Sequence, residues 1–163
     1  MSKHKPLNNT YIFVGLLVIS LACIIVILIT SQEQDKKFIE DYQIFMAAQQ
    51  LEKKGNYDDA EKLIQRLLPQ YQKNYQVQWH YGTILLNQKK YTEAEEQMRL
   101  AREIRPALVM TPRYLYEYGQ ISYYLNNLEV AERYLLESQK YNQPEINKKS
   151  RELLEVVAKG KKG

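Results

Sequence analysis

The pattern of hydrophobic positions divides the chain into two parts. Residues 11–29, YIFVGLLVISLACIIVILI, include no charged side chain. As a helix this stretch is roughly 28 Å long at about 1.5 Å per residue, which is close to the hydrocarbon thickness of a bilayer. We therefore expect a transmembrane anchor over residues 11–30, preceded by a short basic tail over residues 1–10.

Two other interpretations of this block stay open. Lys3, His4 and Lys5 resemble the basic leader of a cleaved secretory signal, but the apolar core exceeds the ~7–15 residues of such signals and no small-residue cleavage site follows it. Residues 20–23, which end at Cys23, faintly resemble a lipoprotein signal, although the residues after them stay mainly apolar. An uncleaved anchor fits best, with the only cysteine as a packing residue inside it.

The basic residues on the two sides of the anchor are balanced. Lys3 and Lys5 precede it, and Lys36 and Lys37 follow it with acidic residues beside them. We expect the N-terminus in the cytoplasm and the large C-terminal part outside the cytoplasmic membrane of a bacterium, because the α-amino group adds to the N-terminal charge. The opposite orientation stays an alternative.

Beyond the anchor, the chain lacks helix-breaking residues until Gly55. Residues 31–40 are therefore expected to form a helical linker that continues the membrane helix. From residue 41 the apolar positions recur at the spacing of one helix face, and residues 54–56 make a turn before a second helix begins near Tyr57. The face of the first helix consists of Ile44, Ala47, Ala48 and Leu51.

The same arrangement recurs along the chain. Tyr57 precedes Tyr91 by 34 residues, and Gly82 precedes Gly119 by 37. A fixed period near 34 indicates stacked helical hairpins. We assign three units, with a three-residue insertion before the last, to residues 41–74, 75–108 and 112–145. A final amphipathic helix over 146–159 is expected to cap the stack, and residues 160–163 form a disordered tail.

The small and large positions of these units resemble the tetratricopeptide repeat family. Its first-helix pattern is matched by Ile44, Ala47, Ala48, Leu51, by Gln78, Tyr81, Gly82, Leu85, and by Leu115, Tyr118, Gly119, Ser122. Its second-helix pattern is matched by Ala60, Ile64, Leu67, Gln72, by Ala94, Met98, Ala101, Pro106, and by Ala131, Leu135, Ser138, Gln143. The resemblance implies an all-α fold, a right-handed superhelix of three helical hairpins. Three departures stand out: Gln78 lies where the family prefers a bulky apolar residue, Leu67 replaces a small residue, and the first and third repeats lack the closing proline.

The sequence offers little for catalysis. Its only histidines are His4 and His80, and it has no phosphate-binding glycine loop and no metal-ligand spacing. We therefore expect no enzyme, no cofactor and no metal site. The part of the chain after the anchor has 21 basic and 19 acidic residues, and its basic residues form no stripe. Nucleic acid is therefore not an expected partner. The basic residues near the C-terminus are expected to keep the cap soluble, with a contact to anionic lipid headgroups as the alternative.

By this resemblance, the first helices of the units line a concave groove for a peptide or helical segment. The residues expected there are Tyr42, Phe45, Gln49, Trp79, Thr83, Leu86, Tyr116, Gln120, Tyr123 and Tyr124. The basic clamp with which some family members hold a C-terminal carboxylate is not matched, because the corresponding positions include Phe45 and His80. An aromatic groove suits a segment with apolar side chains. The alternative is that several of these rings pack between neighbouring helices.

These observations predict a membrane-anchored scaffold that binds a segment of another protein, as an adaptor or assembly factor for an envelope complex. The alternative is a cytoplasm-facing receptor for targeting segments of client proteins. The identity of the partner and the oligomeric state stay open.

Overall fold

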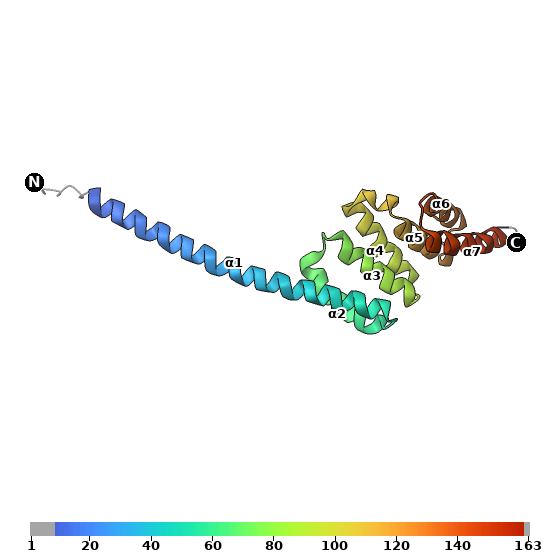
Figure 1. Cartoon of the computed structure of the whole chain (residues 1–163), viewed down its shortest axis with the longest axis horizontal. Helices are drawn as coiled ribbons and strands as arrows, with labels where there is room; N and C mark the ends of the chain where they lie inside the picture. Colours follow the sequence, from blue (N-terminus) through green and yellow to red (C-terminus); the bar gives the residue numbers. More distant parts are fainter. Residues whose placement is uncertain (1–8, 162–163) are drawn as a thin grey trace, which may run out of the picture. The chain divides into compact units, whose positions relative to one another are not determined.

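The computed structural model describes the backbone of residues 9–161 and the side chains of residues 13–26 and 30–161 (Figure 1). The basic tail predicted for residues 1–10 and the tail predicted for 160–163 therefore lie partly outside the described residues. All described elements are helical, which confirms the predicted all-α class. They are α1 (Asn9–Lys53), α2 (Tyr57–Tyr71), α3 (Tyr75–Asn87), α4 (Tyr91–Ile104), the 3-10 helix η1 (Pro106–Met110), α5 (Pro112–Tyr124), α6 (Leu128–Ser138) and α7 (Pro144–Gly160).

Helix α1 runs without a break through the predicted anchor and linker into the first repeat. Two of its polar side chains are satisfied within the helix, because Ser20 Oγ donates to the Leu17 carbonyl at 2.8 Å and Thr30 Oγ1 donates to the Val26 carbonyl at 2.9 Å. Hydroxyl groups bonded in this way add little polarity to an apolar helix surface.

The chain divides into two units, and the boundary falls inside α1 after Tyr42. In the N-terminal unit, the large apolar side chains from Phe13 to Val26 are 49–74% exposed. By length and composition, α1 is the one described helix that is able to cross a membrane. A signal sequence near an N-terminus has the same character, so the anchor stays a prediction.

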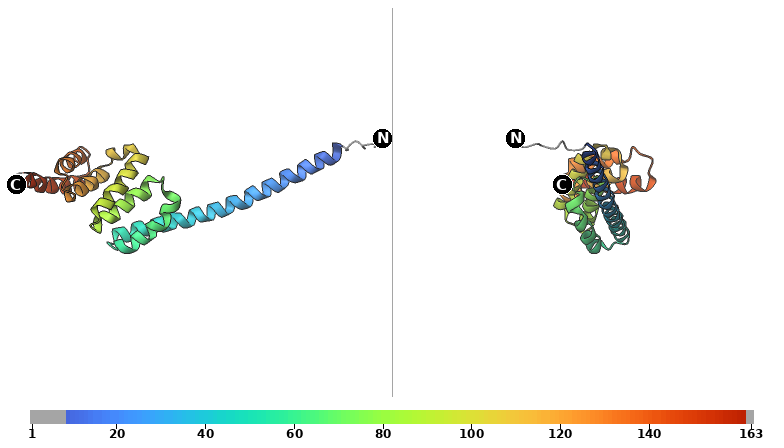
Figure 2. Two further views of the ribbon diagram at one scale, coloured as in Figure 1. Left: turned by 180° about the vertical axis from the view of Figure 1, so that it is seen from behind. Right: turned by 90° about the vertical axis from the view of Figure 1, so that its left-hand side faces the viewer.

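The second unit begins at Gln43 and consists of helical hairpins that follow one another in chain order (Figure 2). Their turns share one conformation, in which Gly55, Lys89 and Asn126 have left-handed φ angles of 77°, 64° and 61°. In each turn the next amide bonds back to a carbonyl five residues earlier, as from Lys90 N to Leu85 O at 2.9 Å. This bond pattern ends a helix with one left-handed residue. The turns therefore repeat at the predicted spacings of 34 and 37 residues.

Small residues let paired helices approach closely. A Cβ atom on Gly82 would lie 2.9 Å from Met98 Cγ, and one on Gly119 would lie 2.9 Å from Leu135 Cγ. In the first hairpin the corresponding positions are Ala48 and Ala60, which are fully buried in one core cluster. The small positions of the sequence pattern are thus the points where the two helices of a hairpin touch.

The predicted insertion before the third repeat lies at η1. Pro106 starts this short helix, and the side chain of Leu108 is buried beneath it. Pro112 then occupies the first position of α5, where a missing amide hydrogen does no harm. At the C-terminal end, α7 packs on α6 and buries Ser150 and Val157, as a capping helix must.

Candidate functional site

The first helices of the hairpins lie next to one another: α3 contacts α5, and α5 contacts α7. Two cavities open along this inner layer. One has a volume of about 340 Å³ and is lined by residues from the end of α1, from α3, α5 and α7, including Glu52 and Gln120. The other has a volume of about 600 Å³ and lies between α5 and the start of α7.

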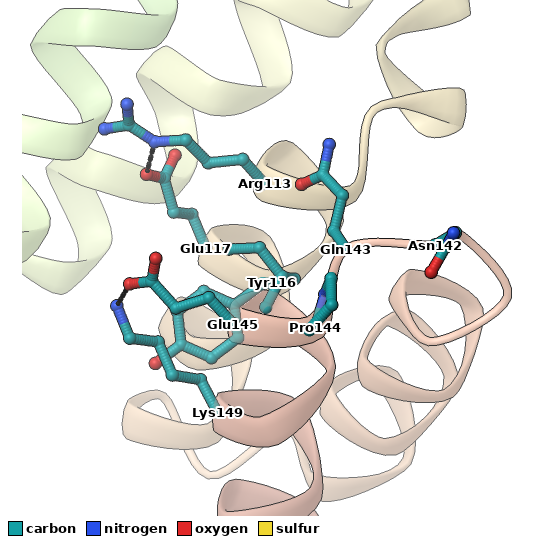
Figure 3. A pocket seen from close by; sticks show the side chains of 9 residues that line it. Arg113, Tyr116, Glu117, Asn142, Gln143, Pro144, Glu145 and Lys149 are labelled. Carbon is teal, nitrogen blue, oxygen red and sulfur yellow. Dashed lines mark hydrogen bonds and ion pairs between the residues drawn. The ribbon is translucent and has the colours of Figure 1, made fainter.

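The two cavities are adjacent, because both are lined by Arg113, Tyr116, Glu117 and Lys149. We refer to the two cavities together as the inner groove. Figure 3 shows the larger part, with the Arg113 and Glu117 pair from α5, the Lys149 and Glu145 pair from α7, and the Tyr116 ring beside the second pair. The groove is therefore built mainly from charged and polar side chains.

Arg113 is the centre of a hydrogen-bonded network along the groove. Its Nη2 donates to Glu52 Oε1 at 2.8 Å, and its Nε donates to Glu117 Oε1 at 2.7 Å. Burial disfavours the charged guanidinium, but the two carboxylates outweigh this and raise the pKa of Arg113. One side chain thus connects the first repeat with the third.

The remaining oxygen atom of each carboxylate also has a partner. His80 Nδ1 donates to Glu52 Oε2 at 2.7 Å, while Trp79 Nε1 donates to Glu117 Oε2 at 2.7 Å and Thr83 Oγ1 donates to it at 3.1 Å. Burial alone raises the pKa of Glu52, but the His80 hydrogen bond and the charge of Arg113 bring this pKa below its ordinary value. Partners from α3 and α5 thus hydrogen-bond both almost fully buried carboxylates, and they favour the ionised form of Glu52.

Four of the ten residues expected in the groove line it, namely Thr83, Leu86, Tyr116 and Gln120. Two others support the network from behind, because Gln49 donates to His80 Nε2 at 2.8 Å and the Phe45 ring meets His80 edge to face at 5.3 Å. Whether any of these residues contacts a partner stays a prediction.

The other four expected residues lie outside the cavities. Trp79 is half-buried and packs against the core cluster around Tyr114. Tyr124 stacks on Tyr91 with ring centroids 4.4 Å apart, and Tyr123 packs on the cluster of α6 and α7. Tyr42 is an exposed residue at the end of the N-terminal unit. The alternative interpretation, in which rings pack between helices, thus describes Trp79, Tyr123 and Tyr124.

The unusual Gln78 is explained by its own contacts. Its side chain is buried, and its Nε2 donates to the Gln72 carbonyl at 3.0 Å, beyond the last turn of α2. This bond satisfies the amide nitrogen of Gln78 at the helix end, while its buried Oε1 has no hydrogen-bond partner among the described residues. Trp79 therefore does not replace the missing bulk, and its indole belongs to the network of Glu117.

Sequence reasoning did not place Glu52, Arg113, Glu117 and Lys149 in the site. Spacing alone offered a weak signal, since Arg113 and Glu117 stand four residues apart on one helix. Such pairs are common on solvated surfaces. The Arg113–Glu117 pair differs from exposed pairs at the same spacing because Arg113 also bonds Glu52, which lies 61 residues earlier in the chain. Within the described residues, no three His, Cys, Asp or Glu side chains gather as a metal site.

Comparison with known proteins agrees with this geometry. Residues 45–109 match the tetratricopeptide repeat family. The structure of the Yersinia enterocolitica type III secretion translocator chaperone SycD is similar with a TM-score of 0.63 and 20% identity, covering 75% of this chain and 86% of that one. No match was found among curated protein sequences.

Two complexes have the same fold. SycD with a peptide of the translocator YopD matches with a TM-score of 0.61 and 20% identity, over 74% of this chain and 93% of that chain. PcrH with the chaperone binding region of PopD matches with a TM-score of 0.61 and 18% identity, over 74% and 92%. The fold is thus a helical repeat. Residues 45–109 match the model of the tetratricopeptide repeat family, and the second unit has the fold of the tetratricopeptide repeat structures.

Proposed function

We propose that this protein is a membrane-anchored scaffold that binds a segment of another protein in its inner groove. The observation that carries the proposal is a pair of adjacent cavities along the first helices of successive repeats, lined by the side-chain donors Arg113 and Lys149. Structures of the same fold hold the YopD peptide and the chaperone binding region of PopD. A rigid helical stack with a preformed groove suits an extended or helical segment.

The apolar part of α1 serves in this proposal as a single transmembrane anchor, with the second unit outside the cytoplasm. Its length and composition support the anchor, and its hydroxyl side chains are bonded within the helix. In this place the protein acts as an adaptor or assembly factor for an envelope complex. The proposed role needs no catalytic group. It is consistent with the two buried carboxylates of the groove, whose oxygen atoms are all hydrogen-bonded within the protein.

The groove assignment is tested by photo-cross-linking in cells from the full chain. A photoreactive residue replaces Gln120, which lines the groove, or Gln70, an exposed glutamine on α2. We expect a discrete partner from position 120 and none from position 70. The same products from both positions, or none from position 120, would contradict the proposed function.

The membrane orientation is tested separately. A reporter fused after Gly163 that is active only outside the cytoplasm supports the proposal, and one active only in the cytoplasm supports the receptor for targeting segments. N-terminal sequencing of the membrane fraction distinguishes an anchor from a cleaved signal. Loss of residues 1–30 from the mature protein would contradict the anchor.

A further inference from the structure

We propose that the segment bound in the inner groove is acidic, and that Arg113 and Lys149 bind its carboxylate side chains. The inference rests on the proposed function and specifies the chemistry of the partner. It depends on which of the charged groups in the groove are still available to a ligand.

The buried acidic groups of the groove are not available. Glu52 and Glu117 are 8% and 6% exposed, and each of their four oxygen atoms accepts at least one hydrogen bond. A basic ligand would have to displace Arg113, His80 or Trp79 to reach them. Replacing a partner within a buried network leaves unpaired groups and is unfavourable.

The basic groups, in contrast, keep unused donors. The Arg113 side chain is 44% exposed, and its contacts to the two carboxylates use Nε and Nη2. Among the described residues, Nη1 makes no hydrogen bond, so this nitrogen can still donate to one oxygen of a ligand carboxylate. Lys149 pairs with Glu145 at 2.7 Å, where the two side chains are 48% and 81% exposed. An exposed ion pair at this spacing contributes little, because water screens both charges, so a ligand carboxylate can replace Glu145.

The two basic groups act on the same space. Both line the two cavities, and the charge of Arg113 opposes protonation of Lys149, although the hydrogen bond to Glu145 raises the pKa of Lys149 overall. The start of α7 adds to this environment, since its cap residue Gln143 makes no side-chain hydrogen bond to the first turn. Pro144 at the first position of α7 has no amide hydrogen, but the amide hydrogens of the next residues in the first turn favour negative charge.

Apolar surface lies directly beside these donors. Tyr116, Pro144 and Ile146 line the same cavity. The formal charges of the residues that line the groove cancel. Two of the three acidic side chains, Glu52 and Glu117, are buried and hydrogen-bonded, whereas Arg113 and Lys149 are partly exposed. The groove therefore fits an internal segment in which acidic side chains alternate with apolar ones, and it requires no free C-terminus.

The test uses the full chain in nanodiscs of zwitterionic lipid and three N-acetylated, C-amidated peptides. Each peptide has about 12 residues, roughly 40 Å when extended, with leucine alternating with glutamate, glutamine or lysine. Binding is followed by peptide fluorescence anisotropy. It is also followed by the fluorescence of Trp79, the only tryptophan, whose indole donates to Glu117. We expect the glutamate peptide to bind at least about tenfold more tightly than the glutamine peptide, and the lysine peptide to bind most weakly.

Lys149→Glu is the decisive variant, and Lys148→Glu is its matched control. Lys148 is the neighbouring residue on α7, with a side chain 74% exposed, and it does not line the groove. We expect Lys149→Glu to weaken the glutamate peptide at least about tenfold and to strengthen the lysine peptide, with less than about a twofold effect from Lys148→Glu. Higher salt weakens the glutamate peptide through screening.

The outcomes separate this inference from the proposed function. Equal binding of the three peptides, or no binding of any, overturns the acidic partner while cross-linking from position 120 still supports the scaffold. Equal effects of the two lysine variants also overturn it. Failure of the cross-linking overturns the scaffold itself.

Discussion

Arg113 Nη2 lies 2.8 Å from Glu52 Oε1, although 61 residues separate the two in the chain. The contact joins the last turn of α1 to the first turn of α5, so it crosses the whole second repeat. It also places a charged pair on the inner side of a stack whose repeats pack through apolar clusters and are further joined by polar contacts, such as the hydrogen bond from Lys90 Nζ to Glu61 Oε2. Arg113 is thus shared by a buried hydrogen-bonded network and by the proposed binding site.

Arg113→Ala is expected to destabilise the second unit by roughly 2–4 kcal/mol, because it leaves two buried carboxylates without their cation. The measurement is urea unfolding of the full chain followed by Trp79 fluorescence. Arg151→Ala, on the exposed face of α7, is the control and is expected to change stability by less than about 0.5 kcal/mol. An unchanged unfolding midpoint for Arg113→Ala would show that the network does not stabilise the fold.

The stability that Glu52 supplies is expected to disappear in acid. Its folded-state pKa lies below the ordinary value of 4.5 because the His80 and Arg113 contacts outweigh the effect of burial. A carboxyl group with a lowered pKa contributes stability above its unfolded-state pKa, and this contribution is lost as the pH falls through the folded-state value. The difference in unfolding free energy between the wild type and Glu52→Gln should therefore be constant near neutral pH and shrink below pH 4.5. Glu155→Gln, on an exposed position of α7, is the control. A difference that stays constant into acid would contradict the assignment.

Gly82→Ala is expected to destabilise the second hairpin. The new Cβ would lie 2.9 Å from Met98 Cγ and 3.2 Å from the Ala94 carbonyl oxygen. Alanine improves helix propensity by about 1 kcal/mol, but overpacking of a tight helix contact costs about 1–3 kcal/mol, so we expect a net loss of roughly 1 kcal/mol. At Gly160 the nearest atom is Leu128 Cδ1 at 3.4 Å, an ordinary contact. Thermal unfolding should thus show a lower midpoint for Gly82→Ala and no decrease for Gly160→Ala.

The turn of the second hairpin can be improved by glycine. Lys89 has a φ of 64°, which is unfavourable for a residue with a Cβ atom, whereas Gly55 occupies the equivalent place in the first turn. We expect Lys89→Gly to stabilise the protein by about 0.5 kcal/mol, after the greater freedom of glycine in the unfolded chain is included. The reciprocal Gly55→Lys should destabilise by about 1 kcal/mol. Chemical denaturation of the two variants checks both signs, and a stabilising Gly55→Lys would contradict the account of the turns.

The site could be predicted only in part from the sequence, and particular residues show why. Tyr116 and Gln120 line the groove as expected because they lie on the inner face of the third repeat's first helix. Trp79 lies on an equivalent helix, yet its ring packs on Tyr114 and its indole donates to Glu117. Helical spacing states which face a residue occupies, but the neighbouring helix decides whether that face is open or covered.

The sequence by itself determined the helices, their pairing into hairpins and the repeat period. These features depend on short stretches of sequence. The uncharged length of α1 and the spacing of apolar residues determine the helices, while small residues at close contacts and short turns with one left-handed residue determine their pairing. The tertiary structure alone decided the character of the groove, because that depends on residues distant in the chain. Glu52, Arg113 and Glu117 are ordinary charged residues in the sequence. They become a buried network only where three helices exclude water and leave each carboxylate oxygen beside a donor.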